Sequence, residues 1–412
     1  MLKISRRNIL VGLDVGTNAI KAALGEINQQ NEVHVLGLAQ VASSGLRKGN
    51  IIDIENTARS IDTCLNELER LTGLEILSTV TGFSGISVSS VNNHAVVAIG
   101  NTNYEISRDD KERVLHSARN ITLPPDKTIV QTIERQYIID GYDGVKDPLG
   151  MVGNRLEAEV LIIIAATAAL QNLQRSAQRI NLHFDQIIYN QVLAAESVLM
   201  PAEKEMGVAV VDMGGGTTEI SVFNQGAIQA TSVLPIGGDY ITKDLAIVLR
   251  TSIEEAARIK ENFGLADPEA ARDDVTVNMR NIQGNETKQV SQRLVAEIIS
   301  ARVMEMLEMI YTELQQLADV DKMAGGIVFT GGGAQLTGLI ALMETYMDIP
   351  VRLGRPENIK GLSNEMNLPQ NAVALGGLMY GLKHMEPAAF EVDSGISGVF
   401  DKFSLWFRDL FS

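Results

Sequence analysis

Two short stretches of the chain place an aspartate, glycine and threonine at the end of an apolar strand. The first reads LDVGTNAIK from Leu13, and the second reads VVDMGGGTTEISVF from Val210. Glycine permits a positive φ and lets backbone N–H groups approach an anion, and threonine adds a hydroxyl donor. An aspartate at the strand end can hold hydrated Mg²⁺, which keeps several of its waters. Each stretch therefore has the composition of a phosphate-binding turn.

A third glycine-rich turn, Thr330-Gly331-Gly332-Gly333, joins an apolar strand to a helix, where a nucleoside can lie against bare backbone. It is not a Walker A loop, which needs Gly-Lys followed by Ser or Thr, and it is not G-x-G-x-x-G. One D-x-G-T turn alone is most often a plain hairpin. Two such turns, one in each half of the chain, together with the third turn, favour a nucleotide site.

Hydrophobic periodicity predicts the elements that position these turns. Residues 8–27 have the pattern of a strand, a tight turn and a returning strand, and residues 84–164 form a β–α–β–β block of subdomain size. Within this block, Ser107 is predicted to cap a helix. Further elements are expected as a short strand over 186–189 and helices over 54–71, 166–180, 191–199, 239–249, 252–262, 297–318 and 372–382. Glu196 is expected on the exposed face of its helix.

The composition narrows the class of protein. The 412 residues carry a net charge of −16, which argues against a general nucleic-acid binder, because binding to phosphates requires a basic surface. The one cysteine, Cys64, excludes an internal disulfide and zinc sites built from several cysteines, and favours the cytoplasm. The N-terminus has no signal-peptide pattern, and the longest apolar stretch is well short of the ~20 residues that span a bilayer.

The last residues differ from the rest of the chain. Residues 386–398 have no apolar period and are predicted to be a linker. Beyond them, apolar side chains recur along one face of a predicted amphipathic helix over 399–412, about 20 Å long. The predicted membrane-binding side chains are Phe400, Phe403, Trp406, Phe407, Leu410 and Phe411. A helix docked on its own domain is the alternative, but the linker and the exposed aromatics favour a lipid surface.

The three turns resemble the phosphate-1, phosphate-2 and adenosine motifs of the actin/Hsp70/sugar-kinase superfamily, in the same order and with similar spacing. The block at 84–164, the segment ASSGLRKGNIIDIE from Ala42 and the apolar tail further resemble the FtsA family of bacterial cell-division proteins. The resemblance covers essentially the whole chain. It implies an α/β, two-lobed actin-like (ribonuclease-H-like) ATPase fold, with a small α+β subdomain inserted in the first lobe and a C-terminal amphipathic helix.

The resemblance also implies a division into domains. The first lobe core would comprise 1–83 and 165–205, and the inserted SHS2-like subdomain 84–164. The second lobe core would comprise 206–240 and 306–385, with a helical and strand subdomain at 241–305. The linker and the membrane-targeting helix would complete the chain.

The same resemblance assigns expected roles in binding ATP and Mg²⁺. Asp14 and Asp212 would flank Mg²⁺, directly or through water. The phosphates would be held by Gly16, Thr17, Asn18, Gly214, Gly215, Gly216 and Thr217, and the nucleoside would contact Gly331, Gly332 and Gly333. Lys21 is either a phosphate-side lysine or a solvated hairpin residue, and Lys260 resembles an adenine-side lysine. Gln191 would orient water for at most slow ATP hydrolysis, or simply opens a helix.

The implied function is that of a filament-forming adaptor. It would tether the ring of the tubulin-like protein FtsZ to the cytoplasmic face of the inner membrane at the division site, as a peripheral protein, and help recruit later division proteins through 84–164. The FtsZ tail would contact the 241–305 subdomain, with Lys288, Arg293 and Arg302 as candidate partners for its acidic residues or as ordinary solvated side chains. The alternatives are a small-molecule kinase of the sugar-kinase type, a pilus-assembly adaptor and a chaperone ATPase.

Overall fold

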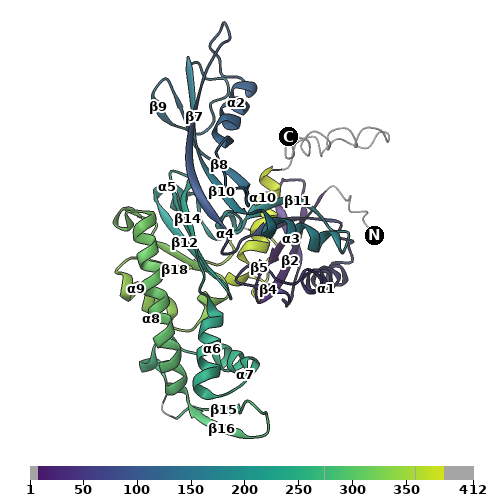
Figure 1. Ribbon diagram of the computed structural model, residues 1–412, viewed down its shortest axis with the longest axis vertical. Coiled ribbons are helices and arrows are strands. Elements are labelled where there is room, and N and C mark those ends of the chain that lie inside the picture. Colours follow the sequence, from purple (N-terminus) through teal and green to yellow (C-terminus); the bar gives the residue numbers. More distant parts are fainter. Residues whose placement is uncertain (1–7, 273, 358, 385–412) are drawn as a thin grey trace.

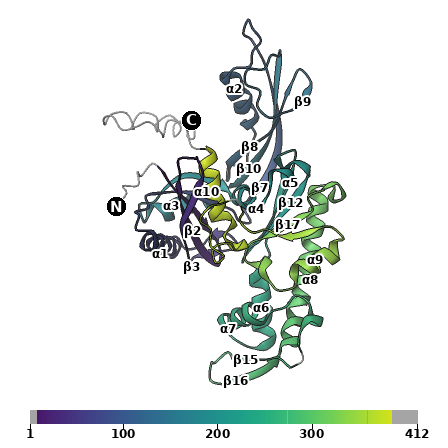
Figure 2. The same ribbon diagram turned by 180° about the vertical axis from the view of Figure 1, so that it is seen from behind.

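The structure is a computed structural model that describes residues 8–384 apart from 273 and 358. The predicted linker and tail helix therefore lie outside the described residues. Figure 1 shows an elongated molecule in which the 84–164 block forms one end and a group of helices with a small hairpin forms the other. Between these ends lie two lobes, side by side, which the view from behind also separates (Figure 2).

Each lobe is built on a five-stranded sheet, and the two sheets have the same strand order. The first has the order β11-β6-β1-β2-β3, and the second has the order β14-β13-β12-β17-β18. In both, three antiparallel strands are extended by two parallel ones. The first sheet comprises β1 (Ile9–Val15), β2 (Ala19–Ile27), β3 (Val33–Ala42), β6 (Ser78–Phe83) and β11 (His183–Tyr189); the second comprises β12 (Val208–Met213), β13 (Thr218–Asn224), β14 (Ala227–Leu234), β17 (Ile327–Thr330) and β18 (Val351–Leu353).

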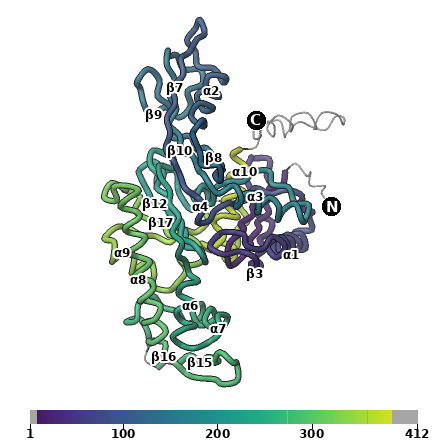
Figure 3. Tube along the Cα trace, viewed as in Figure 1, coloured from purple at the N-terminus to yellow at the C-terminus, as the bar shows by residue number. Residues whose placement is uncertain are grey.

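The central strands are apolar on both faces because helices cover both sides of each sheet. In the first lobe, α1 packs Ile61 and Leu68 against Leu13 of β1, while α10 packs Leu375 against Ala23 on the opposite face. The first-lobe helices are α1 (Ile54–Thr72), α3 (Thr167–Gln178), α4 (Asn190–Val198), α5 (Pro201–Met206) and α10 (Ala372–His384). The chain thus returns to the first lobe at its end, as the tube in Figure 3 shows.

The 84–164 block is a separate sheet with one helix, in the order β7-β10-β8-β9. Ser107 caps the helix as predicted, since its hydroxyl accepts from the N–H of Asp110 and the Asp110 side chain accepts from the N–H of Ser107. Apolar side chains of the helix, among them Val114, pack on the sheet. The elements are β7 (Ser89–Ala98), α2 (Arg108–Arg119), β8 (Lys127–Ile139), β9 (Tyr142–Val145) and β10 (Arg155–Ala166).

The second lobe carries helices and a hairpin at the far end of the molecule. They are α6 (Gly238–Leu249), α7 (Ile253–Phe263), β15 (Thr276–Arg280), β16 (Thr287–Ser291) and α8 (Gln292–Leu317), which runs back toward the sheet, whereas α9 (Leu339–Met347) lies beside β18. Two elements begin earlier than predicted: β11 begins at His183 instead of residue 186, and α8 begins at Gln292 instead of residue 297. None of the helices in the described part of the chain combines the length and apolarity needed to cross a bilayer.

The expectation for Glu196 was wrong. Its carboxylate accepts from Lys204 Nζ at 2.8 Å and also pairs with Lys383 of α10, and its side chain is only 16% exposed. Periodicity placed it outside the apolar stripe of α4, but α10 and α5 pack against that side. The two lysines lower the pKa of Glu196 against the opposing effect of its burial.

Close packing of α10 on α4 gives the first testable prediction. A methyl group at Gly376 would lie 1.8 Å from the carbonyl oxygen of Leu193. Gly376→Ala should therefore lower the free energy of unfolding by about 1–3 kcal/mol, because the backbones must separate. Chemical denaturation measures the effect. Gly100→Ala is the matched control, since nothing lies within 4 Å of its added carbon; equal loss in both variants would contradict this packing account.

Candidate functional site

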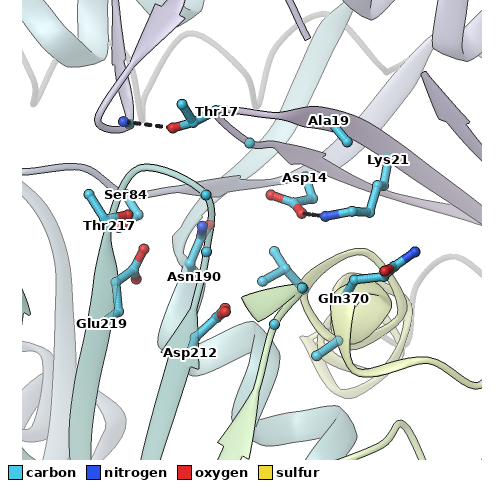
Figure 4. A pocket seen from close by; sticks show the side chains of 18 of the residues that line it. Asp14, Thr17, Ala19, Lys21, Ser84, Asn190, Asp212, Thr217, Glu219 and Gln370 are labelled. Atoms are coloured by element: carbon cyan, nitrogen blue, oxygen red, sulfur yellow. Dashed lines mark hydrogen bonds and ion pairs between the residues drawn. The ribbon is translucent and has the colours of Figure 1, made fainter. Parts of the chain in front are cut away.

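A cavity of about 170 Å³ lies where the two lobes meet, and the predicted turns surround it. Figure 4 shows side chains converging on it from both lobes and from the segment that precedes α10. The first lobe contributes Asp14, Gly16, Thr17 and Lys21 of the predicted residues, and the second contributes Asp212, Gly214, Gly215, Thr217, Gly331 and Gly332. Ten of the predicted binding residues therefore line one space, although they come from three separate parts of the chain.

Two hairpins of the same design place the acidic groups. In the first hairpin Asp14 of β1 lies directly across from Lys21 of β2, and in the second Asp212 of β12 lies directly across from Glu219 of β13. Cross-strand neighbours share one face of a sheet, so each pair points to the same side. The first lobe thus presents a carboxylate with a cation, whereas the second presents two carboxyl groups.

This difference sets the electrostatics of the cavity. Lys21 Nζ donates to Asp14 Oδ2 at 2.9 Å, and both side chains are largely buried. The solvated alternative for Lys21 was therefore wrong. Burial and the nearby charge of Asp14 raise the pKa of Asp212 to about 6, although Lys21 opposes the shift. Burial, followed by the charge of Asp212, raises the pKa of Glu219 to about 8.

The third turn approaches the second aspartate closely. Gly331 has φ +84°, and a methyl group there would lie 2.1 Å from Asp212 Oδ1. Glycine is therefore required by both the backbone angle and the carboxylate. Gly332 lines the cavity, but Gly333 does not; it begins the 3₁₀ turn Gly333–Gln335 and lies against the carbonyl of Met213.

Two predicted phosphate-binding residues contact the other lobe instead of the cavity. Asn18 Nδ2 donates to Asp239 Oδ1 at 2.6 Å, which joins the first turn to the beginning of α6. Gly216 lies against the backbone of Lys48, in the loop between β4 (Leu46–Arg47) and β5 (Asn50–Ile51). The Thr17 hydroxyl accepts from the N–H of Gly49 in the same loop at 3.0 Å (Figure 4).

Gln191 and Lys260 also lie outside the lining of the cavity. Gln191 is fully buried, and its Nε2 donates to the main-chain oxygen of Glu219 at 3.2 Å. Lys260 Nζ donates to the carbonyl of Gly238 at 3.2 Å and to Thr242 Oγ1 at 2.9 Å. Burial lowers the pKa of Lys260, partly opposed by the charge of Asp239. The structure thus places Lys260 behind the Gly237-Gly238 turn, where it supports that turn.

Sequence reasoning missed several residues of the cavity, above all Glu219 and Asn190. Glu219 could have been found, because it is the one charged residue in the otherwise uncharged strand TEISVFN. Asn190 immediately precedes Gln191, and the pattern gave no basis for choosing between two adjacent amides. Within the described residues, Glu219 Oε2 and Asn190 Oδ1 are both buried without a hydrogen-bond partner.

The predicted partner residues have differing environments. Lys288 is exposed on β16. Arg293 pairs with Glu269 at 2.6 Å, and Arg302 pairs with Asp244 at 2.5 Å. Two of the three cations therefore already have acidic partners. The predicted membrane-binding side chains lie beyond the described residues.

Two like sheets flanking a cavity, with an aspartate turn from each, define a two-lobed actin-like protein of the nucleotide-binding type. Solved structures share this fold: a type IV pilus PilM–PilN complex aligns with a TM-score of 0.63 at 16% identity over 90% of this chain and 98% of that one. MreB5 of Spiroplasma citri bound to AMPPNP aligns with a TM-score of 0.55 at 14% identity, covering 91% and 96%.

Sequence comparison identifies the family within this class. The chain is 37% identical to the cell division protein FtsA of Pseudomonas aeruginosa over 93% of this chain and 91% of that protein. It is 35% identical to FtsA of Neisseria meningitidis, covering 97% and 98%. The family model "Cell division protein FtsA" matches residues 209–376, and "SHS2 domain inserted in FTSA" matches 85–164. The chain belongs to the FtsA family.

The raised pKa of Glu219 predicts a pH dependence of stability. Because the folded, nucleotide-free protein holds this proton more tightly than the unfolded chain, Glu219 contributes stability at low pH that is lost as pH rises from the ordinary glutamate range through about 8. Glu219→Gln should remove this loss and leave the variant more stable than the parent at pH 8.5, by at least about 1 kcal/mol. Denaturation of both proteins from pH 5 to 8.5 measures it. Parallel curves would contradict the assignment.

Proposed function

We propose that the cavity binds ATP with Mg²⁺. The glycine turns leave backbone N–H groups accessible to phosphate oxygens, and the unpartnered polar atoms of Glu219 and Asn190 call for a polar occupant. Mg²⁺ is usually held by one or two carboxylates together with phosphate oxygens, which fits Asp14 and Asp212. When bound, the ion would neutralise charge on the phosphates.

The roles of the remaining residues follow from their places. Gly16, Thr17, Gly214, Gly215 and Thr217 would hold the phosphates, and Lys21 would hold the Asp14 side chain in place through their ion pair. The nucleoside would lie against Gly331 and Gly332. We assign Asn18, Gly216, Gly333 and Lys260 to the support of these turns. Glu219, in place of Gln191, is the group we propose to hydrogen-bond the water used in slow ATP hydrolysis.

Removing the second carboxylate tests the Mg²⁺ assignment. Asp212→Asn should weaken binding of a fluorescent ATP analogue by about tenfold or more in the presence of Mg²⁺, because a carboxylate oxygen is lost from the ion's surroundings. In excess chelator, the variant and parent should bind within about threefold of each other. Titrations in both conditions separate the effects. A loss of the same size with and without Mg²⁺ would contradict an ion-holding role.

We infer that the protein is an actin-like adaptor of bacterial cell division that forms filaments. The observation that carries this is its identity of 37% over almost the whole chain to a cell division protein of the same family. In this proposal its partners are FtsZ, further copies of itself, later division proteins and lipid at the cytoplasmic face of the inner membrane. We retain the domain division predicted from the sequence, except that α10 (Ala372–His384) belongs with the first lobe, and we place FtsZ at 241–305 and later proteins at 84–164. Lys288 is the strongest of the three candidate contacts, because it is exposed.

The alternatives are less favoured. The likeness to the pilus complex is 16% identical and concerns the fold alone. A small-molecule kinase would need a base beside a separate substrate pocket, and the acidic groups of this site face the phosphate-binding turns. Sugar-dependent ADP production would support that alternative.

The tail supplies the test of membrane attachment. Burial of several large apolar side chains can contribute on the order of 10 kcal/mol before folding costs, whereas the chain as a whole, with its net charge of −16, is repelled by anionic lipid. Phe407→Glu should therefore abolish most ATP-dependent sedimentation with lipid vesicles. Leu405→Glu, off the apolar stripe, is the matched control and should sediment like the parent.

A chain ending at Gly398 should remain in the supernatant. If it sediments as well as the full chain, the anchor is elsewhere. Electron microscopy of the full chain with ATP on a lipid monolayer tests polymerisation, because several tails in one filament bind better than a single tail. Absence of filaments across nucleotides and concentrations would oppose the proposal.

A further inference from the structure

The inserted subdomain makes a direct hydrogen bond to the chain at the edge of the cavity. Gln131, on β8, accepts from the main-chain N–H of Tyr189 through its Oε1, at 3.1 Å. Tyr189 ends β11, and the next residue, Asn190, begins α4 and lines the cavity. A side chain of the inserted subdomain thus fixes the backbone one residue before a cavity residue.

The Tyr189 side chain is held from the opposite direction. It is fully buried, and its hydroxyl shares a hydrogen bond with Thr231 Oγ1 of β14 in the second lobe at 2.7 Å. Thr231 also shares one with Ser221 at 2.7 Å, and its carbonyl accepts from Ser90 of β7 at 3.3 Å. The first lobe, the second lobe and the inserted subdomain therefore meet at this tyrosine.

Asn190 and Glu219 both line the cavity, one from each lobe. Figure 4 shows the Asn190 side chain pointing into the cavity between Glu219 and Asp212. Glu219 comes from the second lobe and Asn190 from the first, and each keeps one buried oxygen without a partner among the described residues. An amide and a carboxyl facing one polar space can hold a water between them. Gln191 Oε1 is also unpartnered among the described residues, but Gln191 does not line the cavity and its Nε2 donates to the main chain of Glu219.

We propose that Asn190 orients the water that attacks the terminal phosphate, and that Gln131 of the inserted subdomain is the positioning residue that keeps Asn190 in place. This inference rests on the proposed binding of ATP. In the step, the water oxygen bonds to the terminal phosphorus, and the bond from that phosphorus to the bridging oxygen breaks. ADP keeps the electron pair, and the proton released from the water leaves with the inorganic phosphate. The rate of hydrolysis thereby depends on the position of the inserted subdomain relative to the two lobes.

The test separates positioning from binding and from folding. Gln131→Leu removes the acceptor for the Tyr189 N–H and should slow single-turnover ATP hydrolysis by about tenfold or more, since small displacements at a reacting centre are costly. The dissociation constant of a non-hydrolysable analogue should change less than about twofold. Gln131→Glu keeps an accepting oxygen at the same reach and should recover the rate to within about threefold.

Gln136→Leu is the matched control. Gln136 lies on the same strand and also accepts from a main-chain N–H, that of Gly144 at 2.9 Å, at a position that does not line the cavity. It should hydrolyse ATP like the parent. Asn190→Ala tests the proposal directly: it should slow ATP hydrolysis while its affinity for the non-hydrolysable analogue is retained. This variant replaces Gln131→Leu as the test if thermal unfolding shows that Gln131→Leu is unstable.

Three results would overturn the inference. These are parent-like hydrolysis by Gln131→Leu or by Asn190→Ala, equal slowing by Gln131→Leu and Gln136→Leu, and failure of Gln131→Glu to recover any rate. If the parent binds the analogue but does not hydrolyse ATP, this inference fails while the nucleotide site stands. If the parent binds no nucleotide, the proposed function itself fails and the inference with it.

Discussion

Three acidic side chains and one lysine share the cavity between the lobes, and this imbalance governs the site. Burying a charge is costly unless it is paired, and Lys21 pairs with Asp14 alone. Asp212 and Glu219 respond by holding protons more tightly, with raised pKa values. A divalent cation would remove this cost. The charge of the cavity therefore favours cations, and the geometry that creates this preference is the shared register of two hairpins.

That register could be predicted in part from the sequence. The alternating apolar pattern predicted both hairpins, and the family resemblance of the three glycine turns implied the two lobes and ten of the residues that line the cavity. Such features are local, because a turn and its flanking strands are contiguous in the chain. The cross-strand position of Glu219, two residues beyond Thr217, was also available from the hairpin register. Glu219 lies on the returning strand, outside the turn motif that signals phosphate binding.

What escaped prediction depends on contacts between distant segments. Lys260 has the right residue type, but the packing of α7 on α6 brings its ammonium group to the Gly238 carbonyl. Gln191 and Asn190 differ by one helical position, or about 100°, and only the docking of α4 decides which amide faces the cavity. Glu196 shows the same limit, because its burial is created by α10, which lies far away in sequence.

The inserted subdomain is also held in place by contacts between segments that are distant in sequence. Its sheet is anchored through one side-chain acceptor to the strand end that bears Asn190, and through Ser90 to the second lobe. The hydrogen bonds at Tyr189 join the first lobe, the second lobe and the inserted subdomain. Because hydrogen bonds are directional and short, rotation of one of these parts would break some of them. In the proposed coupling, a displacement of the subdomain by a neighbouring molecule would be felt at Tyr189 and at the polar space between Asn190 and Glu219. Coupling between two sites is reciprocal, so in this proposal the occupant of the cavity would in turn bias the position of the inserted subdomain.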